Sequence, residues 1–280
     1  MKELTPRQVQ EGELNILRVL DQLCRKLDLK YYLMWGTLIG AARHQGFIPW
    51  DDDLDVGMPR PDFDRLMDYL KLHAEELLPL KLMSCDTNPD YIYPIPRLCD
   101  TRYYIDYQGA TDYGLGLFVD IYPLDGCGQD EHYIESTYRK RLNYDRLTCL
   151  AGSKSFQRSA QGRWRDPIKY LMFRYAKSRG PHYFVKKLEK LATACSYEDS
   201  SYISLMVWDD QRKPFPKEWF ADTVELPFEG GSFLAPKEYD KVLRSYYGDY
   251  MQLPPEEERI GHHYYTAYLK DESCTDDGVV

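Results

Sequence analysis

The cysteines of this sequence lack the spacings that define a disulfide framework or a zinc site. There are seven, an odd number, and no two of them stand in CxxC or zinc-finger spacing. We therefore interpret them as reduced and mostly buried thiols of a cytoplasmic protein. None lies in a recognisable nucleophile motif, so catalysis by cysteine is not expected.

Long apolar runs are missing as well. The most apolar stretch, residues 31–42, is about twelve residues long and contains two glycines, which makes it too short to cross a bilayer. The opening residues, MKELTPRQVQ, are polar and charged and do not resemble a secretory signal. These absences predict a cytoplasmic protein that is neither exported by a classical signal nor integral to the membrane.

The chain lacks an excess of positive charge: 45 acidic residues outnumber 36 Lys and Arg, and the net charge of −9 argues against a nucleic-acid partner. Residues 139–190 are the exception, with 15 Lys and Arg against three acids. Within them, residues 163–180 combine a basic face with apolar residues such as Leu171, a combination typical of helices on anionic membrane surfaces. We expect peripheral association with the inner face of the membrane; a solvated basic face over an ordinary core is the alternative.

The order of apolar patterns predicts a mixed fold. Three-to-four-residue spacing predicts a helix over residues 6–29. The strand patterns that follow, up to about residue 125, alternate with shorter helices, one closed by Gly46 and one over residues 61–78. After Gly128 the pattern becomes mainly helical, with helices predicted over residues 131–150, 166–195 and 236–247, and residues 271–280 are expected to fray. We therefore predict an α/β (α+β) protein with a mixed-sheet core over residues 1–128. Residues 129–280 form a mainly helical region that includes the basic segment 139–190 and a C-terminal segment returning to the core.

Four aspartates crowd into the stretch FIPWDDDLDVGM, between apolar neighbours. Side chains alternate along a strand, so Asp53 and Asp55 are predicted to share one face while Leu54 and Val56 enter the core. Asp120 is a lone acid inside the apolar strand pattern LFVDIYP. A buried unpaired carboxylate is costly, and Mg²⁺ shared by these three would neutralise them. The alternatives are a solvated turn for the cluster and an internal salt bridge for Asp120.

Gly36 and Thr37 follow an apolar strand pattern and open a short helix pattern. Backbone N–H groups at such a position can hold phosphate, glycine allows close approach, and the threonine hydroxyl adds a donor. The pair alone is a weak signal. With D-x-D 16 residues later and a third strand aspartate, it forms the pattern of the nucleotidyltransferase fold.

The run MWGTLIGAARHQGFIPWDDDLDVGM resembles the core motif of the LicD family, which includes bacterial phosphocholine transferases and is related to fukutin-type ribitol-phosphate transferases. FVDIYPLDG and YYGDYMQLPPEEERIGHH resemble two further blocks of that family. The resemblance implies a nucleotidyltransferase-like fold and Mg²⁺-dependent transfer of phosphocholine from CDP-choline. The implied acceptor is a hydroxyl of a cell-surface glycan precursor, of teichoic acid or lipopolysaccharide type, carried on a lipid in some cases.

On this resemblance, Asp53 and Asp55 are expected to bind Mg²⁺, and Asp120 to share a second metal or to take the acceptor's proton. Asp51 either joins the metal or caps its loop, and the role of Asp52 stays open. The remaining candidates would contact phosphate: Gly36, Thr37, Arg43, Arg97, His262 and His263.

Choline would demand aromatic faces, because a quaternary ammonium cannot donate hydrogen bonds. The sequence offers Trp35, Trp50, Tyr93, Tyr122 and Trp208 near the motif blocks. Two other readings stay open: transfer of ribitol or glycerol phosphate from a CDP donor, and transfer of NMP from an NTP to a small molecule.

Overall fold

The computed structural model describes residues 1–107, 113–158, 163–208, 213–259, 261 and 265–271. The chain divides into two compact units. The first contains residues 1–83, 96–122 and 218–280, and the second contains residues 84–95 and 123–217.

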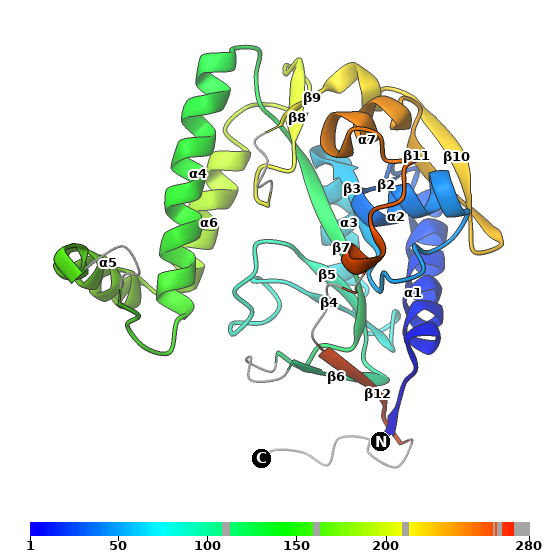
Figure 1. Cartoon of the computed structure of the whole chain (residues 1–280), viewed down its shortest axis with the longest axis horizontal. Helices are drawn as coiled ribbons and strands as arrows, with labels where there is room; N and C mark the ends of the chain where they lie inside the picture. Colours follow the sequence, from blue (N-terminus) through cyan, green and yellow to red (C-terminus); the bar gives the residue numbers. More distant parts are fainter. Residues whose placement is uncertain (108–112, 159–162, 209–212, 260, 262–264, 272–280) are drawn as a thin grey trace. The chain divides into compact units, whose positions relative to one another are not determined.

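The first unit is built on a sheet whose strand order is β2-β3-β7-β5-β4 (Figure 1). β2 pairs antiparallel with β3, β5 with β7, and β4 with β5. Every residue of β3 and β7 is buried, which agrees with their apolar sequences. The bounds are Tyr32–Leu33 for β2, Asp55–Pro59 for β3, Leu80–Met83 for β4, Arg97–Asp100 for β5 and Leu117–Gly126 for β7.

Helix α1, Pro6–Leu27, is specified by its sequence at both ends. Thr5 caps its first turn in a capping box with Gln8, Pro6 occupies the first helical turn, and Asp28 ends it in a left-handed conformation. Its apolar stripe, which includes Leu17 and Leu20, is buried, and the helix contacts β5. Helix α3, Arg60–Leu72, contacts β3 and β4 and is shorter than the predicted helix over residues 61–78.

The segment around Gly36 and Thr37 is helical from Trp35 onward. Helix α2, Trp35–Ile39, continues into a π-helical turn, Gly40–His44, which ends at Gln45 with a positive φ rather than at the predicted Gly46. Trp35 itself has φ +48°, a left-handed conformation that is unusual for a bulky residue. Such a conformation costs of order 1–3 kcal/mol and persists only where the surrounding structure holds it.

The C-terminal residues of the first unit contain strands that the sequence patterns did not indicate. β12 lies between β1 and β6 in a three-stranded antiparallel sheet, and β10 and β11 form a hairpin. Helix α7, Tyr239–Tyr247, lies within the predicted helix and packs against α2 and β11 (Figure 1). The strand bounds are Lys2–Glu3 for β1, Tyr103–Tyr107 for β6, Thr223–Phe228 for β10, Gly231–Pro236 for β11 and Tyr265–Leu269 for β12.

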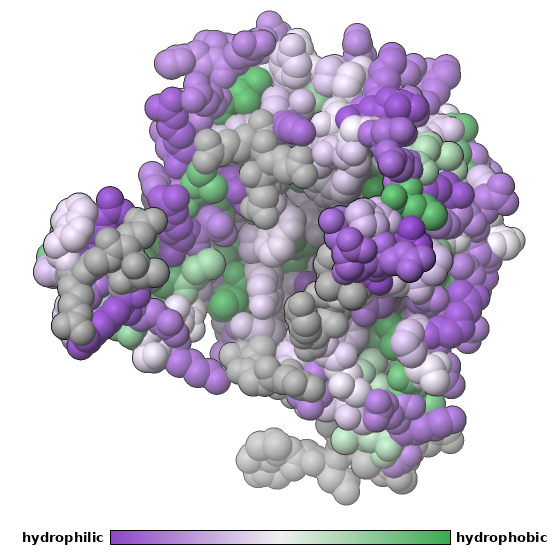
Figure 2. All heavy atoms as spheres, in the orientation of Figure 1, coloured by the Kyte–Doolittle hydropathy of each residue, from purple (hydrophilic) through white to green (hydrophobic). Residues whose placement is uncertain are grey.

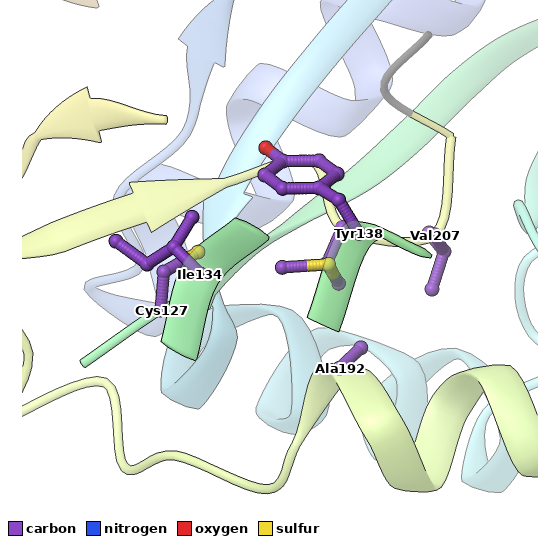
Figure 3. Close-up of a cluster of buried hydrophobic side chains, with 6 residues drawn as sticks. Cys127, Ile134, Tyr138, Ala192 and Val207 are labelled. Atoms are coloured by element: carbon purple, nitrogen blue, oxygen red, sulfur yellow. The ribbon is translucent and has the colours of Figure 1, made fainter. Parts of the chain in front are cut away.

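The second unit is mainly helical, with α4 over Glu131–Gly152, α5 over Asp166–Arg179 and α6 over Pro181–Ala192. The single helix predicted over residues 166–195 is therefore wrong, because Gly180 adopts φ +76° and separates α5 from α6. Two short strands, β8 (Tyr202–Ser204) and β9 (Phe215–Pro216), extend from the end of β7. Tyr138 of α4 enters a buried cluster with Ile134 and Val207 (Figure 3), and its hydroxyl lies 2.6 Å from Ser204 Oγ.

These elements confirm the predicted α+β class. No helix among the described residues is long and apolar enough to cross a membrane. The predicted fraying of residues 271–280 falls, apart from Asp271, outside the described residues.

Candidate active site

Asp55 and Asp120 stand on neighbouring strands of the central sheet. Asp55 begins β3 and is 5% exposed, and Asp120 lies within β7 and is 7% exposed. The backbone N–H of Asp120 donates to the carbonyl of Leu54 at 3.0 Å, so the two aspartates occupy adjacent positions across the strand pair. The fold therefore brings the two predicted carboxylates together, as the strand patterns suggested.

The Asp55 carboxylate is held in an environment that disfavours its charge. Its Oδ1 is buried without a hydrogen-bond partner, and the hydroxyl of Tyr122 bonds to the side chain. Burial, followed by the charges of Asp53, Asp120 and Asp51, raises the pKa of Asp55 well above its usual value. A bound cation would relieve both the desolvation and the repulsion.

Asp120 has a cation beside it already. Arg97 stands opposite Asp120 in the β5–β7 register, and its Nε donates to Asp120 Oδ1 at 2.6 Å. The guanidinium also lies over the ring of Phe118, 4.1 Å from its centroid. Arg97 was predicted to contact phosphate; the structure places it on Asp120, where it offsets the charge and fixes the carboxylate. This is the salt bridge that the sequence left open as an alternative.

The other aspartates belong to an irregular loop, since β3 begins only at Asp55. Asp53 precedes the strand, so strand alternation alone does not set its direction, although its charge acts on Asp55. The Asp51 carboxylate lies over Gly36, so closely that a Cβ at Gly36 would collide with Asp51 Oδ2. The missing side chain at position 36 thus leaves room for the Asp51 carboxylate, which would have to move if any other residue stood there.

Thr37 supports the strand that carries Asp55. The backbone N–H of Asp55 donates to Thr37 Oγ1 at 2.9 Å, and the threonine side chain is buried. As an acceptor in this bond, the hydroxyl still carries its own proton for donation. The predicted role of Thr37 toward phosphate is thus compatible with a second role, which is to fix the start of β3.

Arg43 and His44 lie in the π-helical turn, away from the strand aspartates in sequence. Arg43 donates to the carbonyls of Tyr250 and Gln252, and its Nε lies 3.0 Å from His44 Nε2. Burial lowers the pKa of Arg43, and burial with the charge of Arg43 lowers the pKa of His44. Arg43 therefore anchors the loop after α7. His262 and His263, the other predicted phosphate contacts, lie outside the described residues.

A buried carboxylate on α1 was missed by the sequence reasoning. Glu13 is fully buried, its Oε2 has no hydrogen-bond partner, and the Tyr265 hydroxyl donates toward its Oε1 at 3.4 Å. Its burial, followed by the charges of Asp53 and Asp52, raises the pKa of Glu13 well above the usual value. The available signal was an acid within the apolar stripe of a helix, four residues after Val9.

Glu13 belongs to a group of hydrogen-bonded side chains that hold the backbone of residues 51–54, here called the acidic loop. Gln10, one turn earlier on α1, donates from Nε2 to the carbonyl of Asp51 at 2.8 Å. The Tyr265 hydroxyl also donates toward the carbonyl of Asp52 at 3.3 Å, so its single proton faces two acceptors. A neutral Glu13 removes the conflict, because it can donate to Tyr265 while Tyr265 donates to Asp52.

The site fits a hard divalent cation in its chemistry. Asp51, Asp53, Asp55 and Asp120 supply only carboxylate oxygens, and Asp55 offers a buried oxygen without a partner. Within the described ranges, no group of three or more His, Cys, Asp or Glu side chains is already arranged around a metal position. Mg²⁺ commonly uses one or two carboxylates together with substrate phosphates, so this donor set suits a cation that arrives with a diphosphate.

Comparison with known proteins shows which class of protein this chain resembles. Residues 28–124, which carry Gly36, Asp55 and Asp120, match a family model described as "LicD/FKTN/FKRP, nucleotidyltransferase domain". Over 275 residues, 96% of this chain and 100% of the relative, the chain is 33% identical to the lipopolysaccharide cholinephosphotransferase LicD of Haemophilus influenzae. An uncharacterized protein of Rickettsia typhi is 31% identical over 128 residues, which is 44% of this chain and 38% of that protein.

The chain belongs to the LicD family. This confirms the family predicted from the motif run at residues 34–58.

Replacing Asp55 by asparagine should stabilise the metal-free protein in a pH-dependent way. The folded-state pKa of Asp55 lies above its unfolded value of 3.8, so the stability its protonation gives is present at lower pH and is lost as pH rises through the folded pKa. The asparagine side chain carries no charge, so the advantage of Asp55→Asn should grow to about 1–3 kcal/mol near neutral pH. Urea unfolding in EDTA across this pH range measures it. The exposed Asp106→Asn serves as control; an equal gain there would contradict the explanation.

Glu13 offers a contrast between two substitutions. Glu13→Gln keeps the hydrogen bonding of a neutral acid and should leave the free energy of unfolding near neutral pH unchanged or higher. Glu13→Leu removes the partner of Tyr265 and should cost about 1–3 kcal/mol. Chemical denaturation compares them, with the exposed Glu11→Leu on the same helix expected to change little. Equal losses for Gln and Leu would show that the charge of Glu13 is required.

Proposed function

We propose that this chain transfers phosphocholine from CDP-choline to a hydroxyl of a cell-surface glycan precursor, of lipopolysaccharide or teichoic acid type, and releases CMP. The observation that carries the proposal is full-length similarity to a lipopolysaccharide cholinephosphotransferase, 33% identical over 96% of this chain. The carboxylates on β3 and β7 support it, because phosphoryl transfer needs charge neutralisation at a diphosphate more than covalent help. Transfer of ribitol or glycerol phosphate is the sibling reaction that the same carboxylates would serve.

The chemistry is a displacement at phosphorus. The acceptor oxygen forms a bond to the phosphorus that bears choline, the bond from that phosphorus to the CMP oxygen breaks, and the acceptor loses its proton. In this proposal Asp53 and Asp55, with Asp51 beside Gly36, would hold Mg²⁺, which neutralises the diphosphate charge when bound. Asp120, fixed by Arg97 at 2.6 Å, would take the acceptor's proton or share a second metal ion.

A donor panel tests the reaction. The protein is incubated with Mg²⁺, a glycan acceptor and one of CDP-choline, CDP-ribitol, CDP-glycerol, CTP or ATP, and CMP is measured against pyrophosphate. CMP released from CDP-choline alone is expected, and Asp53→Asn or Asp120→Asn should lower its rate at least about 100-fold. Asp106→Asn is the matched control. Pyrophosphate release would overturn the proposal, and full turnover in both active-site variants would overturn the assignment of their roles.

We place this reaction in the cytoplasm, at the inner face of the membrane, where a lipid-linked acceptor would be met. Support comes from α5, which buries only Ala176 of its fourteen residues. Ile168, Leu171 and Tyr175 lie on one face of the helix and are exposed, and basic residues such as Arg174 accompany them. In the space-filling view the group at the position of α5 combines strongly hydrophilic residues with paler ones (Figure 2). The helix thus exposes apolar residues beside basic ones, a combination that membrane-surface helices use.

Vesicle binding checks this placement. The full chain should float with vesicles containing about 30% phosphatidylglycerol and not with pure phosphatidylcholine vesicles, since the helix is basic. Leu171→Glu, at a position 68% exposed, should reduce the bound fraction severalfold. Leu72→Glu on α3, at a position 81% exposed, is the matched control and should bind as the unchanged protein does. Equal binding by Leu171→Glu and the unchanged protein would exclude α5 as the contact.

A further inference from the structure

Three aromatic side chains gather beside the acidic loop in the first unit, on two elements that pack together. Trp35 begins α2, and Tyr246 and Tyr247 end α7, which contacts α2 (Figure 1). The Trp35 ring meets the Tyr246 ring edge-on, with centroids 4.6 Å apart, and the Tyr246 and Tyr247 centroids are 6.2 Å apart. We call Trp35, Tyr246 and Tyr247 the aromatic wall.

The aromatic wall is not part of the buried core. Tyr247 is 43% exposed, and Trp35 and Tyr246 are half-buried. Aromatic side chains that only fill a core are normally buried, as Tyr31 and Tyr32 are in the same unit. The exposed ring surface of the wall is therefore available to a ligand.

The wall lies next to negative charge. Trp35 precedes Gly36, whose missing side chain leaves the space that the Asp51 carboxylate occupies. Tyr247 is partly buried, and this partial burial raises the pKa of its hydroxyl, with the charges of Asp55, Asp51 and Asp53 adding to the shift. Tyr247 therefore lies close enough to feel the charge of the carboxylates that would hold Mg²⁺, although it is far from them in the sequence.

The backbone of Trp35 adds an independent indication. Its φ of +48° is the conformation that glycine adopts freely and a bulky side chain rarely does. Strained backbone of this kind clusters at ligand sites, where the surrounding structure holds it. Here the strained backbone belongs to Trp35, the first residue of the helix that carries Gly36 and Thr37.

We infer that the aromatic wall binds the quaternary ammonium group of the donor, with the neighbouring carboxylates adding long-range attraction. A trimethylammonium group offers no hydrogen-bond donor, and aromatic faces near negative charge are what attract it. A ribitol or glycerol moiety would need hydroxyl partners instead, so the wall would set the choice among donors. This inference rests on the proposed function for the identity of the donor, but binding of the headgroup can be measured without turnover.

Phosphocholine and glycerol phosphate, titrated separately into the full chain by calorimetry, are the probes. Trp35→Gly and Tyr247→Leu should each weaken phosphocholine binding roughly tenfold while leaving glycerol phosphate unchanged. Trp35→Gly relieves the strain of the positive φ but also removes the ring that packs on Tyr246, so the melting temperature of each variant is measured to show that it is folded. Tyr239→Leu, the same substitution at the start of α7, is the matched control and should bind like the unchanged protein.

Two results would overturn the inference: unchanged phosphocholine affinity in both variants, or an equal loss of both probes, which would indicate damage to a phosphate site. Failure of the proposed function gives a different result. If Tyr247→Leu weakens phosphocholine binding but no CDP donor yields CMP, only the reaction is wrong. If CDP-choline yields CMP with the same KM in Tyr247→Leu and the unchanged protein, only the aromatic wall is wrong.

Discussion

Mutual repulsion among buried carboxylates is the constraint on which the rest of the first unit depends. Asp55 and Asp120 are fixed on adjacent strands, and the charges of Asp51 and Asp53 reach Asp55 as well. A fold can hold such a group only if other interactions keep the strands and the loop in place. Those interactions are visible: Arg97 pairs with Asp120, Thr37 accepts from the Asp55 backbone, and Gln10 holds the Asp51 carbonyl. A site held in this way has a high affinity for positive charge before any ligand arrives.

Arg43 and Arg97, the two arginines predicted to contact phosphate, hold parts of the protein in place instead. Guanidinium groups match phosphate oxygens, so Arg43 and Arg97 were natural candidates for substrate contacts. In the folded chain Arg97 is committed to Asp120, and Arg43 to the carbonyls after α7. Both arginines thus hold other protein groups in place. The phosphate groups of a donor would then rely more on a metal ion, backbone N–H groups and the Thr37 hydroxyl.

The sequence predicted what local patterns determine and missed what long-range contacts determine. The helix at Pro6, the strand positions of Asp55 and Asp120 and the α+β class follow from periodicity, capping and burial of apolar runs. The β10–β11 hairpin, the pairing of β12 with β1 and β6, and the Glu13–Tyr265 contact join residues far apart in sequence, where no local pattern records the partner. Gly180 shows the opposite case, because this glycine, followed by Pro181, is itself a local signal for a helix end, and it lies inside the helix predicted over residues 166–195.

The position of β12 has a consequence for how the site is assembled during synthesis. Residues 265–269 lie between a strand at the N-terminus and β6, and Tyr265 reaches both α1 and the acidic loop. All the carboxylates of the site are translated long before this strand leaves the ribosome. Until then the loop of Asp51 and Asp52 lacks the hydrogen bond from Tyr265, and β1 lacks its only neighbour among the paired strands described. For most of its synthesis the nascent chain therefore carries the acidic loop without the contact from Tyr265. The site is complete only when β12 has been made.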